Sequence, residues 1–218
     1  MFQAILFDND GVLVDTEALY FRANRELLAT VGVDLDEAAY IELYLRQGLG
    51  AFHLAAERGL SPADIQALRA ARNRRYIQLV ADEEILIPGV FDLVRRLSGR
   101  YRLAIVTSAE PEPFARSHAR TGLLPFFEVV LTRADTVRAK PDPDPYLLAL
   151  SRLGLDAGQA LVIEDSERGL RAAKAAGLAC WVIPSGLTRG GDFRAADAVL
   201  PDLAAAAARL LAPAVSQS

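Results

Sequence analysis

The sequence of 218 residues predicts an α/β protein, with a doubly wound, Rossmann-like parallel sheet and a group of helices inserted after the first strand. Two observations predict this fold. Short runs rich in valine and isoleucine alternate with segments of helical periodicity, and runs that are apolar at nearly every position are typical of strands buried on both faces. Residues 16–84 contain no such run, so helices alone are expected to interrupt the alternation there.

Each predicted element of the sheet domain follows from its local pattern. The predicted strands are 4–7 (AILF), 103–107 (LAIVT), 127–132 (FEVVLT), 160–165 (ALVIED), 179–183 (ACWVI) and 198–200 (AVL). The helices predicted between them are 89–98, 111–121, 143–153, 167–176 and 203–211. Gly177 stands just past one of these helices, where a residue of left-handed conformation is expected. The tail 212–218 (APAVSQS) is expected to fray.

The interrupting stretch has its own helix signals. Helices are predicted within 16–32, 36–47, 50–59 and 61–84. In the last of these, Ser61 is the expected N-cap, Pro62 takes the first helical position and Asp64 lies in the first turn. We therefore expect two domains, an α/β core made of residues 1–15 and 85–218, and a helical cap domain made of residues 16–84.

Composition narrows the class of protein. A hydrophobic fraction of 52% supports one sizeable core, and 24 basic against 28 acidic residues, net charge −4, give no reason to expect a nucleic-acid partner. The single cysteine, Cys180, excludes an internal disulfide and is predicted to be a core residue. Without a secretory pattern or an apolar run of about 20 residues, we expect a cytoplasmic monomer with no membrane partner.

Polar residues follow the predicted strands at four points. Ligands of open α/β sheets bind beyond the carboxyl ends of the strands, so side chains at these points are expected to share one cleft. The residues are Asp8 and Asp10, Thr107 and Ser108, Lys140, and Glu164 and Asp165.

The chemistry of these residues favours a metal and a phosphate. Asp8 and Asp10 point the same way from an extended segment, and clustered carboxylates repel unless a cation joins them. Mg²⁺ prefers a few carboxylates together with a substrate phosphate. The hydroxyl and backbone N–H groups of 107–108 suit a phosphate oxygen. Lysine occurs only at 140 and 174, so its use at Lys140 in place of arginine indicates a compact ammonium.

Four stretches resemble, in order and spacing, the four motifs of the haloacid dehalogenase-like superfamily. The fourth is similar to the subgroup whose small helical cap follows the first strand. The stretches are FDNDGVLVDTE (7–17), IVTSA (105–109), AKPDPDPY (139–146) and VIEDSERGLRAAKAAG (162–177), and together they span nearly the whole chain.

The resemblance implies a Mg²⁺-dependent phosphatase that acts on a small phosphomonoester, with sugar phosphates as the first class to consider. Asp8 would be the nucleophile that forms an aspartyl-phosphate, and Asp10 would be general acid and then general base. Thr107, Ser108 and Lys140 would bind the phosphate. The metal site would consist of Asp8, Asp165 and the backbone carbonyl of Asp10, with Glu164 either as a further ligand or as a residue that supports the ligands.

Residues of the cap are expected to touch the substrate. Thr16 and Glu17 lie at the predicted hinge, and Gln47 lies in the turn LRQGLG (45–50). Arg72, with Arg74, could contact an anionic or hydroxylated group. By contrast, His53 and His118 are interpreted as ordinary helix residues.

Several activities within the same superfamily compete with this interpretation. β-Phosphoglucomutase-like enzymes carry a histidine in the first cap helix and a lysine in the cap turn, where this chain has Tyr20 and Gln47, so a hydrolase is favoured over a phosphosugar mutase. Dehalogenases lack the second aspartate, which is Asp10 here. Phosphonoacetaldehyde hydrolases need a cap lysine, and 16–84 has none. Asn9 departs from the family, where an apolar residue is more common.

Two alternatives come from other classes of protein. A phosphoryl-accepting signalling module also uses clustered aspartates, a hydroxyl and a lysine, but the order of these residues along the chain and the helical insert argue against it. An inactive scaffold is disfavoured because no key motif residue is missing.

Overall fold

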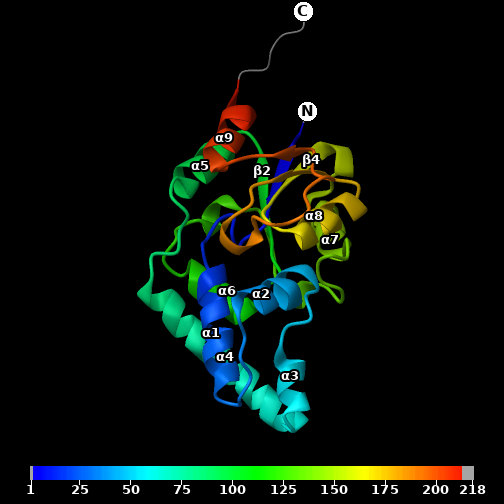
Figure 1. Cartoon of the computed structure of the whole chain (residues 1–218). Helices are drawn as coiled ribbons and strands as arrows, with labels where there is room; N and C mark the ends of the chain where they lie inside the picture. The colour runs from blue at the N-terminus through cyan, green and yellow to red at the C-terminus, as the bar shows by residue number, and fades with distance from the viewer. Residues whose placement is uncertain (1, 213–218) are drawn as a thin grey trace, which may run out of the picture.

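A parallel sheet with strand order β3-β2-β1-β4-β5-β6 forms the centre of the molecule (Figure 1). The computed structural model describes residues 2–212. The strands are β1 (Ala4–Phe7), β2 (Arg102–Val106), β3 (Val129–Leu131), β4 (Ala160–Glu164), β5 (Ala179–Val182) and β6 (Ala198–Val199). Because β1 lies between β2 and β4, the order of the strands reverses beside it, and a crevice is expected at its carboxyl end.

Helices cover both faces of the sheet. The core helices are α5 (Val90–Leu97), α6 (Pro111–His118), α7 (Asp144–Leu153), α8 (Glu167–Ala175) and α9 (Leu203–Leu211). Ile5 and Phe7 of β1 pack in a core with α5 and α9, while Ala4 and Leu6 pack in a second core with α7 and α8. This alternation explains why β1 is apolar at every position, since each fully buried large aliphatic side chain contributes about 1.5–3 kcal/mol.

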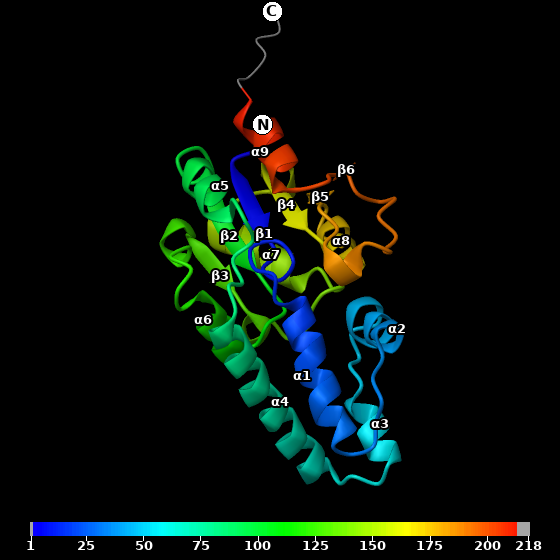
Figure 2. The ribbon, with the colours of Figure 1, turned by 60° about the vertical axis from the view of Figure 1, so that its left-hand side comes forward.

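The insert forms a separate helical group below the sheet (Figures 1 and 2). Its α-helices are α1 (Glu17–Ala29), α2 (Glu37–Tyr40), α3 (Phe52–Glu57) and α4 (Pro62–Asp82). Helices α1 and α4 lie side by side, and Leu28, Tyr40 and Phe52 belong to an apolar cluster of the insert.

The segments that lead into and out of the insert run next to each other. The backbone N–H of Asp15 donates to the carbonyl of Ile85 at 2.7 Å, and that of Ile87 donates to the carbonyl of Leu13 at 3.2 Å. The core and the insert are thus joined by a short paired hinge.

The fold class predicted from the sequence is confirmed, and the predicted strands and core helices occur with ends that differ by at most a few residues. Gly177 has φ +76° just after α8, as expected for a left-handed helix end. Cys180 is fully buried in the core and unpaired, also as expected. None of the helices among residues 2–212 has the length and apolar character needed to cross a membrane. The tail 212–218 was predicted to fray. All of it except Ala212 lies outside the residues that the structure describes.

One predicted helix differs from the observed one. The segment 36–47 begins as α2, with the side chain of Asp36 accepting from the N–H of Ala39, but continues over Ile41–Arg46 with the wider π-helical spacing. The carbonyls of Tyr44 and Arg46 accept hydrogen bonds from arginines of α8, at 3.1 and 3.2 Å. Because these side chains satisfy the carbonyls, the last turn does not need regular α-helical bonding.

The start of α4 gives a test of the fold. Ser61 and Asp64 form a reciprocal capping box, as the sequence predicts. We expect Ser61→Ala to lower the free energy of unfolding by about 0.5–2 kcal/mol, because the N–H of Asp64 loses its acceptor. The matched control is Ser151→Ala, at an exposed position within α7, which should have little effect. Equal urea midpoints for the wild type and Ser61→Ala would contradict the capping role.

Candidate functional site

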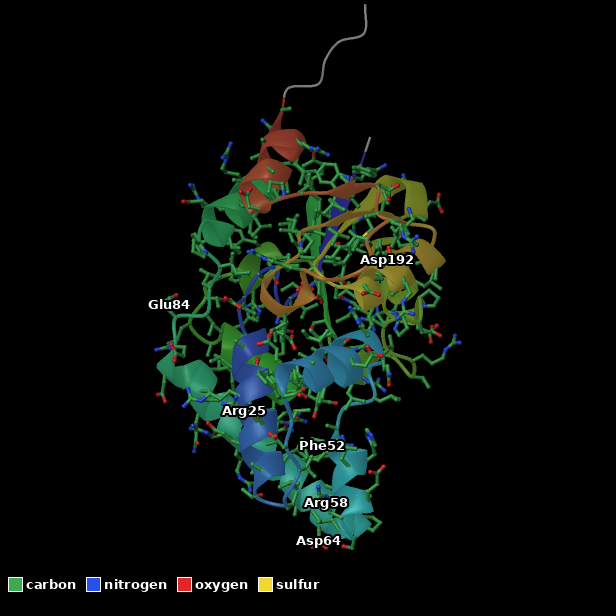
Figure 3. All side chains as sticks on the ribbon, viewed as in Figure 1. Arg25, Phe52, Arg58, Asp64, Glu84 and Asp192 are labelled. Atoms are coloured by element: carbon green, nitrogen blue, oxygen red, sulfur yellow. The ribbon has the colours of Figure 1, made fainter. Side chains whose placement is uncertain are left out.

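A cavity of about 420 Å³ lies between the carboxyl ends of the central strands and the helical insert. Its floor comes from loops that follow β1, β2, β3 and β4, and its roof comes from the insert. Phe52, labelled in Figure 3 at the start of α3, is one of the roof residues. The floor residues include most of those predicted at the strand ends: Asp8, Asp10, Thr107, Ser108, Lys140 and Asp165. The parallel sheet therefore brings side chains more than 150 positions apart into one site.

Lys140 is the centre of the floor. Its Nζ donates to Oδ1 of Asp8 at 2.8 Å, to Oε1 of Glu164 at 2.7 Å and to the carbonyl of Val106 at 2.7 Å. All three ammonium donors are therefore used, and the side chain is only 5% exposed. This geometry fixes the position of Asp8 relative to both neighbouring strands.

Charge around Lys140 is not balanced. Burial lowers the pKa of Lys140, but the attraction of Asp8 and Glu164 outweighs it, so the net pKa is raised. Burial also raises the pKa of Glu164, yet Lys140 reverses this, so the net pKa of Glu164 is lowered. Burial and then the repulsion of Glu164 raise the pKa of Asp8 to about 7. Burial, followed by the repulsion of Asp8 and Glu164, raises the pKa of Asp165 well above its usual range.

The donor set fits a hard divalent cation. Oxygens of Asp8, Glu164 and Asp165 lie within 4.8 Å of one another. Both carboxylate oxygens of Glu164 already accept hydrogen bonds. The donors are Lys140, Tyr146 and Ser166, at 2.7–3.0 Å. Ser185 donates to Oδ2 of Asp165 at 2.9 Å. Two carboxylate oxygens remain that accept no hydrogen bond from a side chain of residues 2–212: Oδ1 of Asp165 and Oδ2 of Asp8. Two free carboxylate oxygens with uncompensated charge are what Mg²⁺ prefers.

The backbone beside this cluster is shaped to admit Asp165. Gly11 has φ +79°, and a Cβ built on it would overlap Oδ2 of Asp165. Any larger residue at this position would both strain the backbone and displace the carboxylate.

Asp10 is held in a different way from Asp8. Its Oδ1 accepts from the hydroxyl of Thr16, and its Oδ2 accepts from Nδ2 of Asn9 at 3.2 Å and from the hydroxyl of Thr107 at 3.4 Å. The Asp10 carboxylate lies outside the Asp8, Glu164, Asp165 cluster. Neutral donors hold it at the cavity wall, and Asp10 itself lines the cavity.

The predicted phosphate-binding hydroxyls lie on the same wall. Thr107 is buried, and its Oγ1 also accepts from the N–H of Ala109 at 3.0 Å. Ser108 is exposed and lines the cavity. The hydroxyl of Ser108 thus faces the cavity, while the hydroxyl of Thr107 and the ammonium of Lys140 already donate to other groups of the floor.

The predicted cap residues are only partly in the cavity. Glu17 and Arg72 line it. Thr16 is buried beneath Asp10 and is not among the lining residues. Gln47 is exposed and donates to Oε1 of Glu42 at 2.7 Å, and Arg74 is exposed on α4, so neither lies in the cavity.

The roof is aromatic and basic. Tyr20, Tyr44 and Phe52 line it together with Arg69 and Arg72. The guanidinium of Arg72 lies 4.5 Å from the ring centre of Tyr20 and donates to Oδ1 of Asn24 at 2.8 Å. Aromatic faces and arginines suit a substrate with both carbon–hydrogen surface and negative charge.

Helix α8 ties the roof to the floor, a connection that the sequence did not reveal. Arg168 donates from Nη1 to the carbonyl of Tyr44 at 3.1 Å and from Nη2 to the carbonyl of Lys140. Arg171 lies three residues later, on the same side of the helix, and donates to the carbonyl of Arg46. The three-residue spacing of Arg168 and Arg171 in the fourth motif is the one feature of the sequence that could have indicated this connection between α8 and the insert. Tyr146, Ser185 and Thr188 were missed because nothing in their local patterns marks them.

His118 is the last residue of α6, as expected for a helix residue. It is 4% exposed, and its Nε2 lies 2.7 Å from Oδ1 of Asn9. The sequence did not predict this contact, because helical periodicity reports only that a face is buried and not which polar group it meets. His53, by contrast, is exposed on α3.

Comparisons with known proteins agree with the site. A sequence profile of the haloacid dehalogenase-like hydrolases matches residues 2–177. The protein CbbY of Rhodobacter capsulatus is 38% identical over 221 residues, which cover 96% of this chain and 97% of that protein. The fructose-1-phosphate phosphatase YqaB of Escherichia coli is 31% identical over 180 residues, which cover 81% of this chain and 94% of that protein. A crystal structure of CbbY from Rhodobacter sphaeroides with xylulose-1,5-bisphosphate has a TM-score of 0.78 at 34% identity, covering 94% of this chain and 96% of that one.

Glu17 gives a test of the electrostatics of the cavity. Burial raises its pKa from 4.5 to about 7, although the hydrogen bond from the hydroxyl of Tyr40 opposes this shift. Because the fold favours the protonated form, this contribution to stability is complete below pH 4.5 and is lost as the pH rises through about 7. We expect Glu17→Gln, with EDTA present, to raise the Tm at about pH 8 and to change it little at about pH 4.

Glu26 serves as the control of opposite sign. Hydrogen bonds from Arg75 and Arg22 lower its pKa to about 2, so its ionised form contributes stability above pH 4.5 that is lost as the pH falls towards 2. Glu26→Gln should therefore lower the Tm at about pH 8. A Glu17→Gln variant that is less stable than the wild type at that pH would show that Glu17 is ionised in the fold.

Proposed function

We propose a reaction and a substrate class for this chain, which belongs to the haloacid dehalogenase-like hydrolase family and is a phosphoric monoester hydrolase. In this proposal it is a Mg²⁺-dependent phosphatase that acts on a small phosphorylated sugar through an aspartyl-phosphate on Asp8. The single observation that carries the proposal is the buried cluster of Asp8, Lys140, Glu164 and Asp165 at the floor of a covered cavity.

The reaction has two displacement steps. A carboxylate oxygen of Asp8 attacks phosphorus, the bond between phosphorus and the sugar oxygen breaks, and Asp10 gives its proton to that oxygen. Water then attacks the phosphorus of the aspartyl-phosphate, and Asp10, now ionised, takes a proton from it. Inorganic phosphate leaves, Asp8 is again a carboxylate, and Asp10 again carries a proton. General acid and base help of this kind contributes roughly 10²–10⁴-fold to the rate.

The residues of the floor would share the charge of the phosphoryl group. Lys140 keeps Asp8 in position and places a positive charge beside the phosphoryl group, and Thr107 and Ser108 would turn their hydroxyls to the phosphoryl oxygens. Asp8, Asp165 and the backbone carbonyl of Asp10 would hold Mg²⁺, with Glu164 as support because its oxygens are already occupied. When bound, Mg²⁺ neutralises negative charge that builds up on the transferring group.

The insert is proposed to act as a lid. In this interpretation residues 16–84 are the cap domain and residues 1–15 and 85–218 are the catalytic core. Closure would exclude bulk water and so strengthen the electrostatic interactions between the floor and the phosphoryl group. Both halves of the cavity come from one chain, and the proposal takes the enzyme to be a cytoplasmic monomer, as expected from the sequence.

The substrate class rests on the roof of the cavity. Among residues 2–212, the ion pairs include neither Arg69 nor Arg72, although both line the cavity. Two arginines without a carboxylate partner favour a substrate with a second anionic group. The bisphosphate bound to CbbY of Rhodobacter sphaeroides supports the same class, and the fructose-1-phosphate phosphatase supports sugar monophosphates.

A phosphosugar mutase is the alternative activity. It would use the same Asp8 and Asp10, and would return the phosphoryl group to the sugar in place of water. Tyr20 and Gln47 stand where the mutases carry a histidine and a lysine, and Gln47 faces away from the cavity, so hydrolysis is favoured. Isomer formation from glucose 1-phosphate that outpaces phosphate release would reverse this preference.

The nucleophile is tested by Asp8→Asn. We expect this variant to lose all measurable Mg²⁺-dependent release of phosphate from p-nitrophenyl phosphate, because an amide oxygen cannot form the aspartyl-phosphate. Circular dichroism should show that the fold survives. Asp92→Asn, whose side chain is 75% exposed, is the control and should keep full activity. Ordinary turnover by Asp8→Asn would refute the assignment.

The second anionic group is tested by Arg72→Gln, with Arg69→Gln as a second variant. Loss of a charge-assisted hydrogen bond, about 1.5–3 kcal/mol, should raise the KM for a sugar bisphosphate by about 10- to 100-fold. The KM for the corresponding monophosphate should change much less. Arg74→Gln, on an exposed part of α4, is the matched control. Equal effects on both substrates would show that these arginines do not bind a second phosphate.

A further inference from the structure

A buried polar pair lies behind the site and has no part in the chemistry described so far. Asn9 is fully buried between the two key aspartates, and His118 at the end of α6 is 4% exposed. Oδ1 of Asn9 lies 2.7 Å from Nε2 of His118, and Nδ2 of Asn9 donates to Oδ2 of Asp10 at 3.2 Å.

The hydrogen-bond directions in this pair are determined by Asp10. A carboxylate only accepts, so the amide of Asn9 must turn its NH₂ group towards Asp10 and its oxygen towards His118. His118 must then carry its proton on Nε2. The other ring nitrogen, Nδ1, is then an acceptor, and it lies 3.0 Å from the hydroxyl of Thr121, which is closer to it than to the carbonyl of His118 at 3.3 Å. The chain of donors therefore runs from Thr121 through His118 and Asn9 to Asp10.

The environment of His118 keeps this direction fixed. Burial lowers the pKa of His118 to about 4, although the charge of Asp10 opposes this. The ring is therefore neutral near pH 7 and has one proton to donate. Phe114 packs against it at 4.6 Å between ring centres. The ring is held by packing on one side and by Thr121 on another.

The local backbone does not need the Asn9 side chain. The turn that follows β1 is closed by the carbonyl of Asn9, which accepts from the N–H groups of Val12, Leu13 and Val14 at 2.8–3.3 Å. Any residue supplies this carbonyl. A buried hydrogen-bonded pair is worth only about 0.5–1.5 kcal/mol, and replacing both partners with apolar groups of similar shape is nearly neutral. Stability of the turn therefore gives little reason for an asparagine here.

We propose that Asn9 and His118 are positioning residues that fix the orientation of the Asp10 carboxylate for proton transfer. This inference rests on the proposed role of Asp10 as general acid and base. Asp10 has three side-chain neighbours that donate to it, and Thr16 and Thr107 are rotating hydroxyls. Asn9 is the planar donor among them, and His118 prevents its amide from turning over.

The test uses Asn9→Leu, His118→Phe and the double variant, each with Mg²⁺. The substrates are phenyl phosphate and p-nitrophenyl phosphate, which have nearly the same shape but different leaving groups. Phenolate leaves poorly and needs the proton of Asp10, while p-nitrophenolate leaves readily without it. Phosphorylation of Asp8 governs kcat/KM for both, so their ratio reports the proton transfer.

We expect each variant to lower kcat/KM for phenyl phosphate by about 10- to 100-fold, and that for p-nitrophenyl phosphate by much less. The double variant should lose no more than either single one, because both act through the same amide. Its Tm should stay close to that of the wild type. Equal losses on the two substrates, or a double variant with wild-type kcat/KM, would overturn the proposal.

A second measurement separates this inference from the proposed function. If wild-type protein releases no phosphate, the proposed function fails, and the side-chain amide signal of Asn9 in an ¹H–¹⁵N spectrum still decides the inference. We expect that signal to shift in Asp10→Ala and in His118→Phe, because each removes one hydrogen-bond partner of the amide. An unchanged signal in Asp10→Ala would show that Asn9 does not bind Asp10, and would overturn the proposal.

Discussion

One buried ammonium among buried carboxylates is the constraint on which the rest of this structure depends. Lys140 uses its three donors on Asp8, Glu164 and a strand carbonyl, so it holds the loops after β1, β2 and β4 at fixed separations. It cannot also neutralise Asp165, whose pKa burial and then Asp8 and Glu164 raise. Attraction within the cluster gives the floor its shape, and the charge left over fits the divalent cation that we propose for this site.

The helix after β4 connects this floor to the roof. Glu164 and Asp165 end the strand, and α8 starts directly after them with Ser166 as its N-cap. A Cβ on Gly169 would overlap the carboxyl group of Glu164, so the helix and the buried carboxylate are in close contact. From the same helix, Arg168 and Arg171 donate hydrogen bonds to the carbonyls of Tyr44 and Arg46, which lie in the π-helical turn of the insert. Helix α8 therefore contacts both the buried carboxylates of the floor and the π-helical turn of the insert.

Sequence reasoning was most successful where the chemistry lies in short contiguous stretches. Parallel strands place their carboxyl ends at one edge, so the sequence alone was enough to predict that Asp8, Lys140 and Asp165 share one cleft. It failed where a contact joins distant elements. The partner of Asn9 lies 109 residues later in α6. A local change of helical spacing was also not predicted: the π-helical turn brings Gln47 to Glu42, and Gln47 is not among the residues that line the cavity. Neither helical periodicity nor composition reports such pairings. The unusual residue between the aspartates was visible in the sequence, but the reason for it required His118.

The central claim is that a divalent cation completes the charge balance between Asp8 and Asp165. A crystal structure of the protein soaked in Mn²⁺, with data collected for anomalous scattering, tests this claim most directly. The account predicts an anomalous peak that contacts one oxygen of each carboxylate at about 2.1 Å, close to the distance typical of Mg²⁺ sites, with Lys140 still bound to Asp8 and Glu164. A well-ordered floor with no peak among these carboxylates, or a peak bound elsewhere in the cavity, would contradict it.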